Sequence, residues 1–374
     1  MSTNPGFTYQ QAGVDTEQAS AGLKGLLHWV TQTHALRQGL GAVRLPIGYY
    51  ANVIDIGQGM GLAISTDGVG SKLLVAQLMD KYDTVGIDCV AMNANDILCV
   101  GAQPLSMVDY LAVQAPHERL LDELGRGLYA GAKQANITIA GGELAQIGEM
   151  IGGVRQGYGF DLAATCVGTV RLDRLIVGQD LQPGDALIGL ASTGIHSNGL
   201  TLARRALLDQ ARLRVDQQIP ELGRSLGDEL LMPTRIYVPE ICAMLEAQLP
   251  VKALLHITGD GLLNLRRVQR EVGFVIDWLP EPPPIFGLIQ AHGRVSDAEM
   301  YQVFNMGVGF CVATAPGAAD RVQAIARQHG VAAYRLGHAV ADAERRIWLR
   351  PRSLVSAGNA FVPGEFAPHS QPTR

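Results

Sequence analysis

The sequence predicts an α/β (α+β) fold of two domains, and three observations lead to this prediction. First, 374 residues with 47% hydrophobic content are enough to build two cores. Second, strand-like and helix-like apolar periods alternate along the chain. Third, turns that contain Gly and Pro separate these stretches. We expect a first domain over residues 1–172, a second over residues 173–350 and a flexible tail over residues 351–374.

The first half alternates short apolar stretches with amphipathic ones. The stretches VIDIG and GLAIS are typical of a β-hairpin, and the second one ends at the polar turn TDGVGSK. Functional groups are common at such strand ends. Helices are expected over residues 19–33, 83–100 and 116–135, and further strands within residues 106–113, 137–142 and 164–170.

A Pro-Gly turn in LQPGDALIGLAS begins the second, strand-rich unit. Helices are expected from about residue 199, over residues 239–248 and from about Leu262. The segment PEPPPI, residues 280–285, is expected to be an extended loop, because proline lacks a backbone donor and restricts the residue before it.

The composition narrows the class of partner. A formal net charge of −5 without long Lys/Arg runs gives no electrostatic footprint for nucleic acid or an anionic membrane. A signal-peptide pattern and a stretch of 18 apolar residues are both missing, so we expect a cytoplasmic protein that binds small molecules or its own copies. Five scattered cysteines without a CxxC pair predict neither a zinc site nor disulfides.

The first cluster that could carry chemistry is the turn STDGVGSKL. Asp67 follows a strand, Gly68 and Gly70 free the backbone, and Lys72 opens a helix. Magnesium takes one or two carboxylates plus phosphates, and a lysine acts as a point charge on those phosphates. The turn is not a Walker A loop, and taken alone it could equally be an ordinary solvated turn.

The second cluster lies on the helix expected over residues 83–100. Asp88, Asn95 and Asp96 recur there at spacings of seven and eight residues, which places them on one face. Eight helical residues span about 12 Å, too far for both carboxylates to grip one ion but suited to metals along a polyphosphate. The apolar neighbours indicate burial, so the two acids need partners or a cleft.

Two further clusters repeat the pattern of glycines beside polar side chains. Gly141, Gly142 and Glu143 follow an apolar stretch, so another carboxylate arrives at a strand end.

No Gly-x-Ser-x-Gly elbow, HExxH helix or dinucleotide fingerprint occurs in a fitting context, which disfavours hydrolase, zincin and dehydrogenase functions.

The segment GIHSNG precedes a helical pattern, so its backbone amides could bind a phosphate. Its side chains His196, Ser197 and Asn198 could serve as phosphate donors, or the segment could be only a capped helix start.

Eight segments, taken in order, closely resemble the phosphoribosylformylglycinamidine cyclo-ligases, also called aminoimidazole ribonucleotide synthetases. The segments are AGVD, STDGVGSKL, DTVGIDCVAMNANDILCVGAQPL, GGE, GFDLAATCVGTV, GIHSNG, PTRIYV and EMYQVFNMGVGF. They keep the family's order up to residue 310 and together are highly specific.

The resemblance implies two α/β domains, the second with a mixed sheet and helices, and a homodimer whose N-terminal strands form a shared barrel. It also implies that ATP and Mg²⁺ bind at glycine-rich loops. In this family, ATP phosphorylates the formyl-amide oxygen of formylglycinamidine ribonucleotide, and an amidine nitrogen then closes the imidazole ring. The products are aminoimidazole ribonucleotide, ADP and phosphate. Such chemistry needs positioning and charge neutralisation rather than a catalytic triad.

Matching positions carry the family's site onto this chain. The resemblance implies catalytic roles for Asp67, Lys72 and Asp96. It implies metal-linked carboxylates at Asp67, Asp96 and Glu143, and nucleotide or phosphate contacts at Asp88, Asn95, Gly68, Gly70, Gly141, Gly142, His196, Ser197 and Asn198.

The chain departs from the family pattern in three places. The family usually has GGETAEMP where this chain has GGELAQIG, so Gln146 replaces a glutamate, and it has TGGG where this chain has TGDG, so Asp260 adds a charge. The early glycine-rich segment is also thin. Two alternatives therefore stay open: another ATP-dependent enzyme of the same superfamily, or a paralogue that binds nucleotide for regulation. The absence of a cysteine before Cys89 disfavours the superfamily members that use an early catalytic cysteine.

Overall fold

The computed structural model describes residues 8, 10–13 and 16–366 and contains two large sheets. The first sheet has the strand order β1-β2-β5-β3-β4. Its strands are β1 Asn52–Gly57, β2 Met60–Gly68, β3 Gln103–Val113, β4 Thr138–Gln146 and β5 Phe160–Arg171. All neighbours pair antiparallel except β3 and β4, which are parallel.

The second sheet has the strand order β15-β14-β13-β10-β12-β6-β11-β9. Its strands are β6 Ala186–Ala191, β9 Val251–His256, β10 Val272–Ile276, β11 Val308–Thr314, β12 Ala333–Ala341, β13 Ile347–Leu349, β14 Leu354–Ala357 and β15 Ala360–Pro363. A small third sheet pairs β7 Gln218–Ile219 with β8 Arg224–Ser225. The mixed sheets confirm the predicted α/β (α+β) class.

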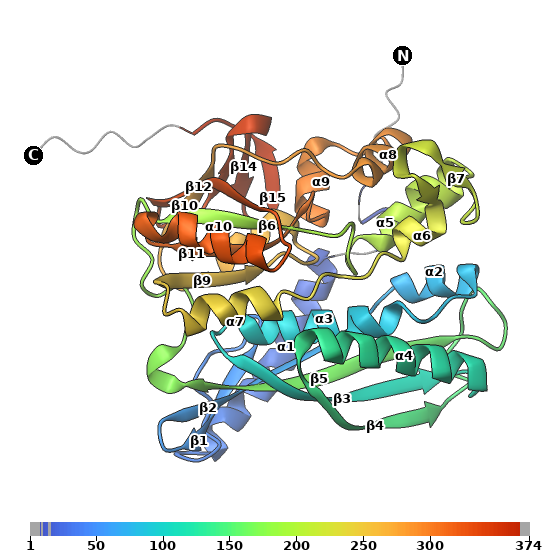
Figure 1. Cartoon of the computed structure of the whole chain (residues 1–374), viewed down its shortest axis with the longest axis horizontal. Coiled ribbons are helices and arrows are strands. Elements are labelled where there is room, and N and C mark those ends of the chain that lie inside the picture. Colours follow the sequence, from blue (N-terminus) through green and yellow to red (C-terminus); the bar gives the residue numbers. More distant parts are fainter. Residues whose placement is uncertain (1–7, 9, 14–15, 367–374) are drawn as a thin grey trace, which may run out of the picture.

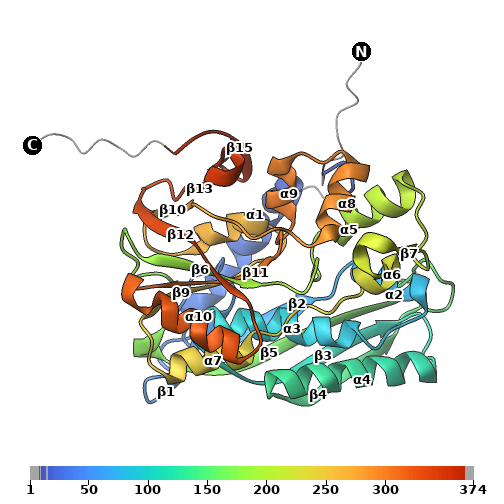
Figure 2. The same cartoon turned by 45° about the horizontal axis from the view of Figure 1, so that its top comes forward.

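Helices fill the space between and around the sheets (Figure 1). They are α1 Thr16–Gln32, α2 Lys72–Met79, α3 Val85–Leu98, α4 Glu118–Ala135, α5 Leu200–Arg204, α6 Leu226–Leu230, α7 Val238–Glu246, α8 Pro284–Gly293, α9 Asp297–Val303 and α10 Ala319–Gln328. Helix α3 packs on β2 and β5 and against α4, and it lies between the two sheets (Figure 1). Figure 2 shows α7 and α10 side by side near β9.

Most elements expected from periodicity are present, including the β1–β2 hairpin and helices α3 and α4. The two large sheets lie on either side of the predicted boundary at residues 172 and 173. No helix within the described ranges is long and apolar enough to cross a membrane.

Three expectations were wrong in part. The predicted flexible tail contains β14 and β15, because apolar side chains alternate there; β14 pairs with β13, and β15 pairs with β14. Residues 367–374 lie outside the described residues. The helix expected from Leu262 is a 3₁₀ segment, η5 Gly261–Arg267. Helix α8 begins at Pro284, inside the expected loop, because proline is tolerated in the first helical turn. In the AGVD segment, Val14 and Asp15 lie outside the described residues.

Glycines allow α3 and α4 to pack closely. A Cβ atom on Gly127 would overlap the Asp83 carbonyl oxygen and would lie 3.1 Å from the Gly86 Cα atom. The contacted atoms belong to the backbone and cannot move aside like a flexible side chain. Glycine at this position therefore fixes the distance between α4 and the helix that carries the site.

We expect Gly127→Ala to lower the free energy of unfolding by about 1–3 kcal/mol through overpacking. Urea unfolding of the purified protein measures this change. Gly125→Ala is the matched control on the same helix, because a Cβ there meets no atom within 4 Å. It should be neutral or stabilise by up to about 1 kcal/mol. Equal stability of the two variants would contradict the packing argument.

Candidate active site

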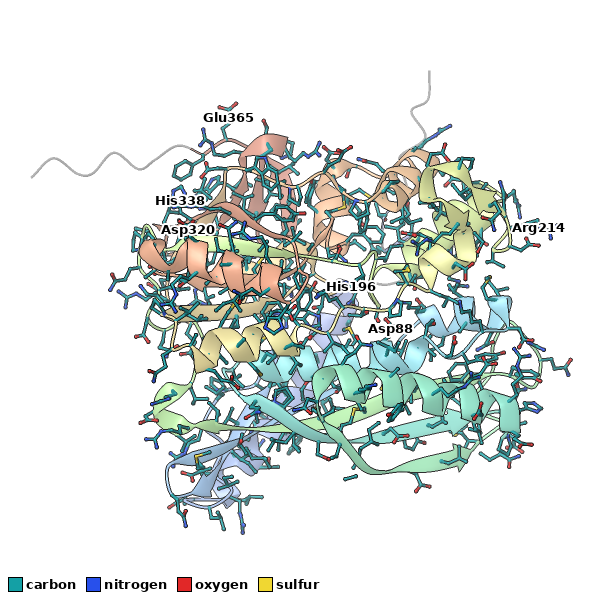
Figure 3. The ribbon with its side chains drawn as sticks, in the orientation of Figure 1. Asp88, His196, Arg214, Asp320, His338 and Glu365 are labelled. Atoms are coloured by element: carbon teal, nitrogen blue, oxygen red, sulfur yellow. The ribbon has the colours of Figure 1, made fainter. Side chains whose placement is uncertain are left out.

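Helix α3 carries predicted site residues into the space between the two sheets. Asp88 and His196, which come from α3 and from the loop after β6, both lie in this central layer (Figure 3). Because α3 contacts elements of both halves, its polar side chains can bind groups of either half.

A group of buried polar residues, which we call the polar junction, centres on Asp88. Lys72 Nζ donates to Asp88 Oδ1 at 2.8 Å and to the Met232 carbonyl oxygen at 2.6 Å. From the second half, Ser197 Oγ donates to Asp88 Oδ1 at 3.1 Å, and the backbone N and Oγ1 of Thr234 each do so at 2.7 Å. One carboxylate oxygen therefore joins the first half of the chain to two segments of the second.

The polar junction changes the roles expected for three residues. Lys72, Asp88 and Ser197 were expected to contact a phosphate or nucleotide, yet all three are buried, and Lys72 and Ser197 both donate to Asp88. Burial lowers the pKa of Lys72, and the neighbouring Asp88 carboxylate opposes this shift. Sequence spacing could not show this, because the counter-ion of Lys72 lies on a different helix.

Asn95 also joins α3 to the second half. Its Nδ2 donates to the Arg235 carbonyl oxygen, and its Oδ1 accepts from the Tyr237 backbone N, both at 2.9 Å. The side chain is fully buried. In this structure Asn95 therefore positions backbone, rather than facing a nucleotide as expected.

His196 is buried and its ring is hydrogen-bonded within its own loop. It has a φ of +66°, and its buried ring accepts from the Thr193 backbone N through Nε2 at 3.2 Å. Burial is the main reason that the pKa of His196 lies well below its ordinary value, and nearby cationic groups lower it further. Because Nε2 accepts, the neutral ring carries its proton on Nδ1, which has no hydrogen-bond partner among the described residues. The expected role of His196 as a phosphate donor stays a prediction.

Asp67 and Asp96 form the more open part of the site. Asp67 ends β2, and its main chain is fixed on α3 by Asn93, whose Oδ1 accepts from Asp67 N at 2.9 Å and whose Nδ2 donates to Asp67 O at 3.1 Å. Burial and then the negative charge of Asp96 raise the Asp67 pKa from 3.8 to about 6. The two carboxylates, which are predicted site residues, thus lie within electrostatic reach of each other.

His256 supports this pair and was missed from the sequence. Its Nδ1 donates to Asp96 Oδ1 at 2.8 Å, and the ring is almost fully buried while the Asp96 side chain is 13% exposed. The signal was available: His256 ends strand β9, and Ile257 alone separates it from the TGDG turn, a strand-end position like the one that drew attention to Asp67.

Glu143 does not join Asp67 and Asp96. In the sheet register, Asp67 pairs with Ala164, Ala164 with Asp109, and Asp109 with Gly142. Paired residues share a face, and successive residues alternate between faces. Glu143 therefore lies on the face opposite Asp67, where it is exposed.

Asp109 is the acid that shares the face of Asp67, and it was not predicted. Burial raises its pKa. A Cβ on Gly142 would overlap its carboxylate, so this predicted nucleotide-binding glycine leaves room for Asp109. Gly141 is exposed on the same strand.

The predicted turn after β2 reaches the second half of the chain. Gly68 N donates to Asp67 Oδ1 at 2.7 Å, and Gly70 has a φ of +73°, a left-handed conformation that favours glycine. Ser71 Oγ lies 2.9 Å from Thr201 Oγ1 on α5. Asn198 is half-buried, and its Oδ1 lies 3.3 Å from the position of a Cβ on Gly259 in the TGDG turn.

A second cation, Arg267, borders the open carboxylates. Its positive charge lowers the Asp67 pKa, against the larger effect of burial. Its guanidinium lies 4.7 Å from the centre of the Tyr50 ring. Thus the candidate site consists of two carboxylates, one arginine and three turns rich in glycine or polar residues.

In metal-free protein we expect Asp67 to titrate near pH 6, and Asp96→Asn to lower this pKa while burial keeps it above 3.8. Because the folded state then binds more protons than the unfolded state between pH 3.8 and about 6, this group's contribution to stability falls as the pH rises through that window. Carboxyl ¹³C NMR of aspartate-labelled protein in EDTA measures the titration. The control is Asp209→Asn, which changes an exposed aspartate and should leave the Asp67 pKa unchanged. If Asp96→Asn also left the Asp67 pKa unchanged, the pairing of Asp67 with Asp96 would be contradicted.

Solved structures with the same fold have low sequence identity. Thiamine-monophosphate kinase from Stenotrophomonas maltophilia is 20% identical, with a TM-score of 0.55 over 83% of this chain and 91% of that one. The hydrogenase maturation protein HypE of E. coli is 18% identical, with a TM-score of 0.54 over 83% and 87%. These similarities show a shared fold.

Sequence relatives are much closer. Phosphoribosylformylglycinamidine cyclo-ligase of Methanothermobacter thermautotrophicus is 46% identical over 318 residues, 85% of this chain and 90% of the relative. That of Thermococcus kodakarensis is 48% identical over 83% and 88%. That of Methanocaldococcus jannaschii is 43% identical over 90% and 93%.

Two domain families cover most of the chain. AIR synthase related protein, N-terminal domain, matches residues 48–170, and AIR synthase related protein, C-terminal domain, matches residues 182–350. Together with the curated relatives, these matches show that the chain belongs to the phosphoribosylformylglycinamidine cyclo-ligase family.

Proposed function

We propose that this protein catalyses the ATP-dependent ring closure of formylglycinamidine ribonucleotide to aminoimidazole ribonucleotide in purine biosynthesis. The observation that carries the proposal is the pairing of Asp67 and Asp96 beside a cation and glycine-bearing turns, in a chain of this family. Such a site can position a nucleotide and neutralise charge, which the activation of an amide oxygen by phosphorylation requires.

The thiols of the chain support this mechanism over covalent catalysis. Burial raises the pKa of all five cysteines, which removes the thiolate needed for nucleophilic attack. Catalysis by placement and electrostatics is therefore the better supported mechanism, with phosphate as the leaving group when the amidine nitrogen attacks.

Mg²⁺ is the cation that fits the open carboxylates. Asp67 and Asp96 offer oxygen ligands, and their mutual repulsion would be relieved by a divalent cation. When bound, Mg²⁺ would neutralise negative charge on the phosphates of ATP. The described residues gather no group of three His, Cys, Asp or Glu side chains for a metal, so phosphate and water oxygens would complete the coordination.

The test of this function is ADP release from magnesium-ATP with and without formylglycinamidine ribonucleotide, with the aminoimidazole product trapped. We expect both products to form together. Asp96→Asn should lower turnover at least about 100-fold and keep the fold, because only a partly exposed charge is lost. The control is Asp209→Asn, which changes an exposed aspartate. ATP binding without turnover would instead favour a regulatory paralogue or another substrate.

We further propose that the protein is a homodimer through the outer face of the first sheet, as the family resemblance implies. Helix α3 covers one face of this sheet, whereas Val108 and Tyr110 on β3 have side chains that are 46% and 45% exposed on the opposite face. Exposed apolar side chains on a sheet face favour association. Dimerisation would also bring the exposed Glu143 to the interface, next to Tyr110 in the register.

A cytoplasmic location remains a prediction.

Tyr110→Glu is expected to convert the dimer to a monomer, because it places a charge in an apolar interface. Light scattering after size-exclusion chromatography measures the mass. Tyr129→Glu on α4, where the tyrosine is 69% exposed, is the control and should leave the mass unchanged. A monomeric wild-type protein, or a dimeric Tyr110→Glu variant, would refute the proposed interface.

A further inference from the structure

The TGDG turn places a carboxylate beside the arginine of the site. Asp260 immediately precedes η5, and Arg267 ends this segment. Arg267 Nη2 donates to Asp260 Oδ2 at 3.0 Å. The Asp260 side chain is 53% exposed and that of Arg267 is 32% exposed, so solvent molecules and solutes can reach the pair.

The Arg267 guanidinium has unused donors. Its hydrogen bond to Asp260 is the only one it makes with the described residues. The Tyr50 ring supports the guanidinium at 4.7 Å, and Tyr50 is itself fixed by a hydrogen bond from its hydroxyl to the Asn264 carbonyl oxygen at 3.3 Å. A planar guanidinium held on an aromatic ring with free N–H groups is suited to bidentate binding of an oxyanion.

Three carboxylates act on Arg267, and only one of them is hydrogen-bonded to it. Asp67 and Asp96 lie within electrostatic reach. Asp260 holds the guanidinium through the single hydrogen bond. An incoming phosphate group could take the place of the Asp260 carboxylate on the guanidinium while the Tyr50 contact is kept.

We propose that Arg267 binds a phosphate group of a ligand and that Asp260 competes with this phosphate for the guanidinium. This inference deepens the proposed function and rests on it only for the source of the phosphate, which is the ribonucleotide or ATP. Asp260 is thereby an affinity-setting residue of this chain: it neutralises Arg267 in the free protein and weakens the binding of the anion.

Calorimetric titration in EDTA tests the proposal without turnover, so failure here is distinct from failure of the ring-closing function. The probes are inorganic phosphate, ribose 5-phosphate and the ATP analogue AMPPCP. Asp260→Asn and, as a second variant, Asp260→Gly should bind the relevant probe about two- to fivefold more tightly, the effect of removing a partly exposed ion pair. Arg267→Gln should bind it at least about tenfold more weakly.

The control is Asp173→Asn, which breaks a similar exposed ion pair with Arg171 elsewhere on the surface and should change no affinity. Tighter binding of ribose 5-phosphate alone by the Asp260 variants identifies the ribonucleotide phosphate, and tighter binding of AMPPCP alone identifies the nucleotide. Unchanged or weaker binding of every probe by both Asp260 variants overturns the proposal, as does unchanged binding by Arg267→Gln or the absence of measurable binding to all proteins.

Discussion

The burial of the Asp88 carboxylate is the constraint on which the rest of the structure depends. A buried charge is tolerated only when it is paired and hydrogen-bonded. Here Lys72 supplies the opposite charge, and Ser197 and Thr234 supply donors from the second half of the chain. All of these bonds end on Oδ1, so satisfying this one oxygen requires the two halves to meet in one arrangement. The Asn95 contacts to the backbone of residues 235 and 237 fix the same arrangement about two turns further along α3.

The open site follows from this arrangement. Since α3 is held against both sheets, Asp96 on its last turn lies between Asp67 at the end of β2 and His256 at the end of β9. Burial, and after it the negative charge of Asp96, raise the pKa of Asp67, so the two carboxylates lie within electrostatic reach of each other. The helix thus separates two tasks: its buried acid, Asp88, joins the domains, and its partly exposed acid, Asp96, is available for a cation or a nucleotide.

Much of this could be predicted from the sequence, and the remainder could not for physical reasons. Periodicity predicted α3, α4 and the β1–β2 hairpin, and strand-end reasoning found Asp67. The sequence pattern did not separate the role of Asp88 from that of Asp96, because both lie on one helical face and only tertiary packing decides which one is buried. The side of the sheet that Glu143 occupies depends on strand register, which pattern alone left open. The pairing of Asp260 with Arg267 also depends on tertiary structure, since the 3₁₀ segment between them brings the two side chains together.

The most direct test of the central claim is a double-mutant cycle between Asp88 and Thr234, measured by urea unfolding of Asp88→Asn, Thr234→Val and the double variant. If the carboxylate joins the domains through Thr234, the double variant should lose about 1–3 kcal/mol less unfolding free energy than the sum of the two single losses. Losses that add within about 0.5 kcal/mol would show that the two residues do not interact, and would contradict the role of the polar junction as the link between the domains.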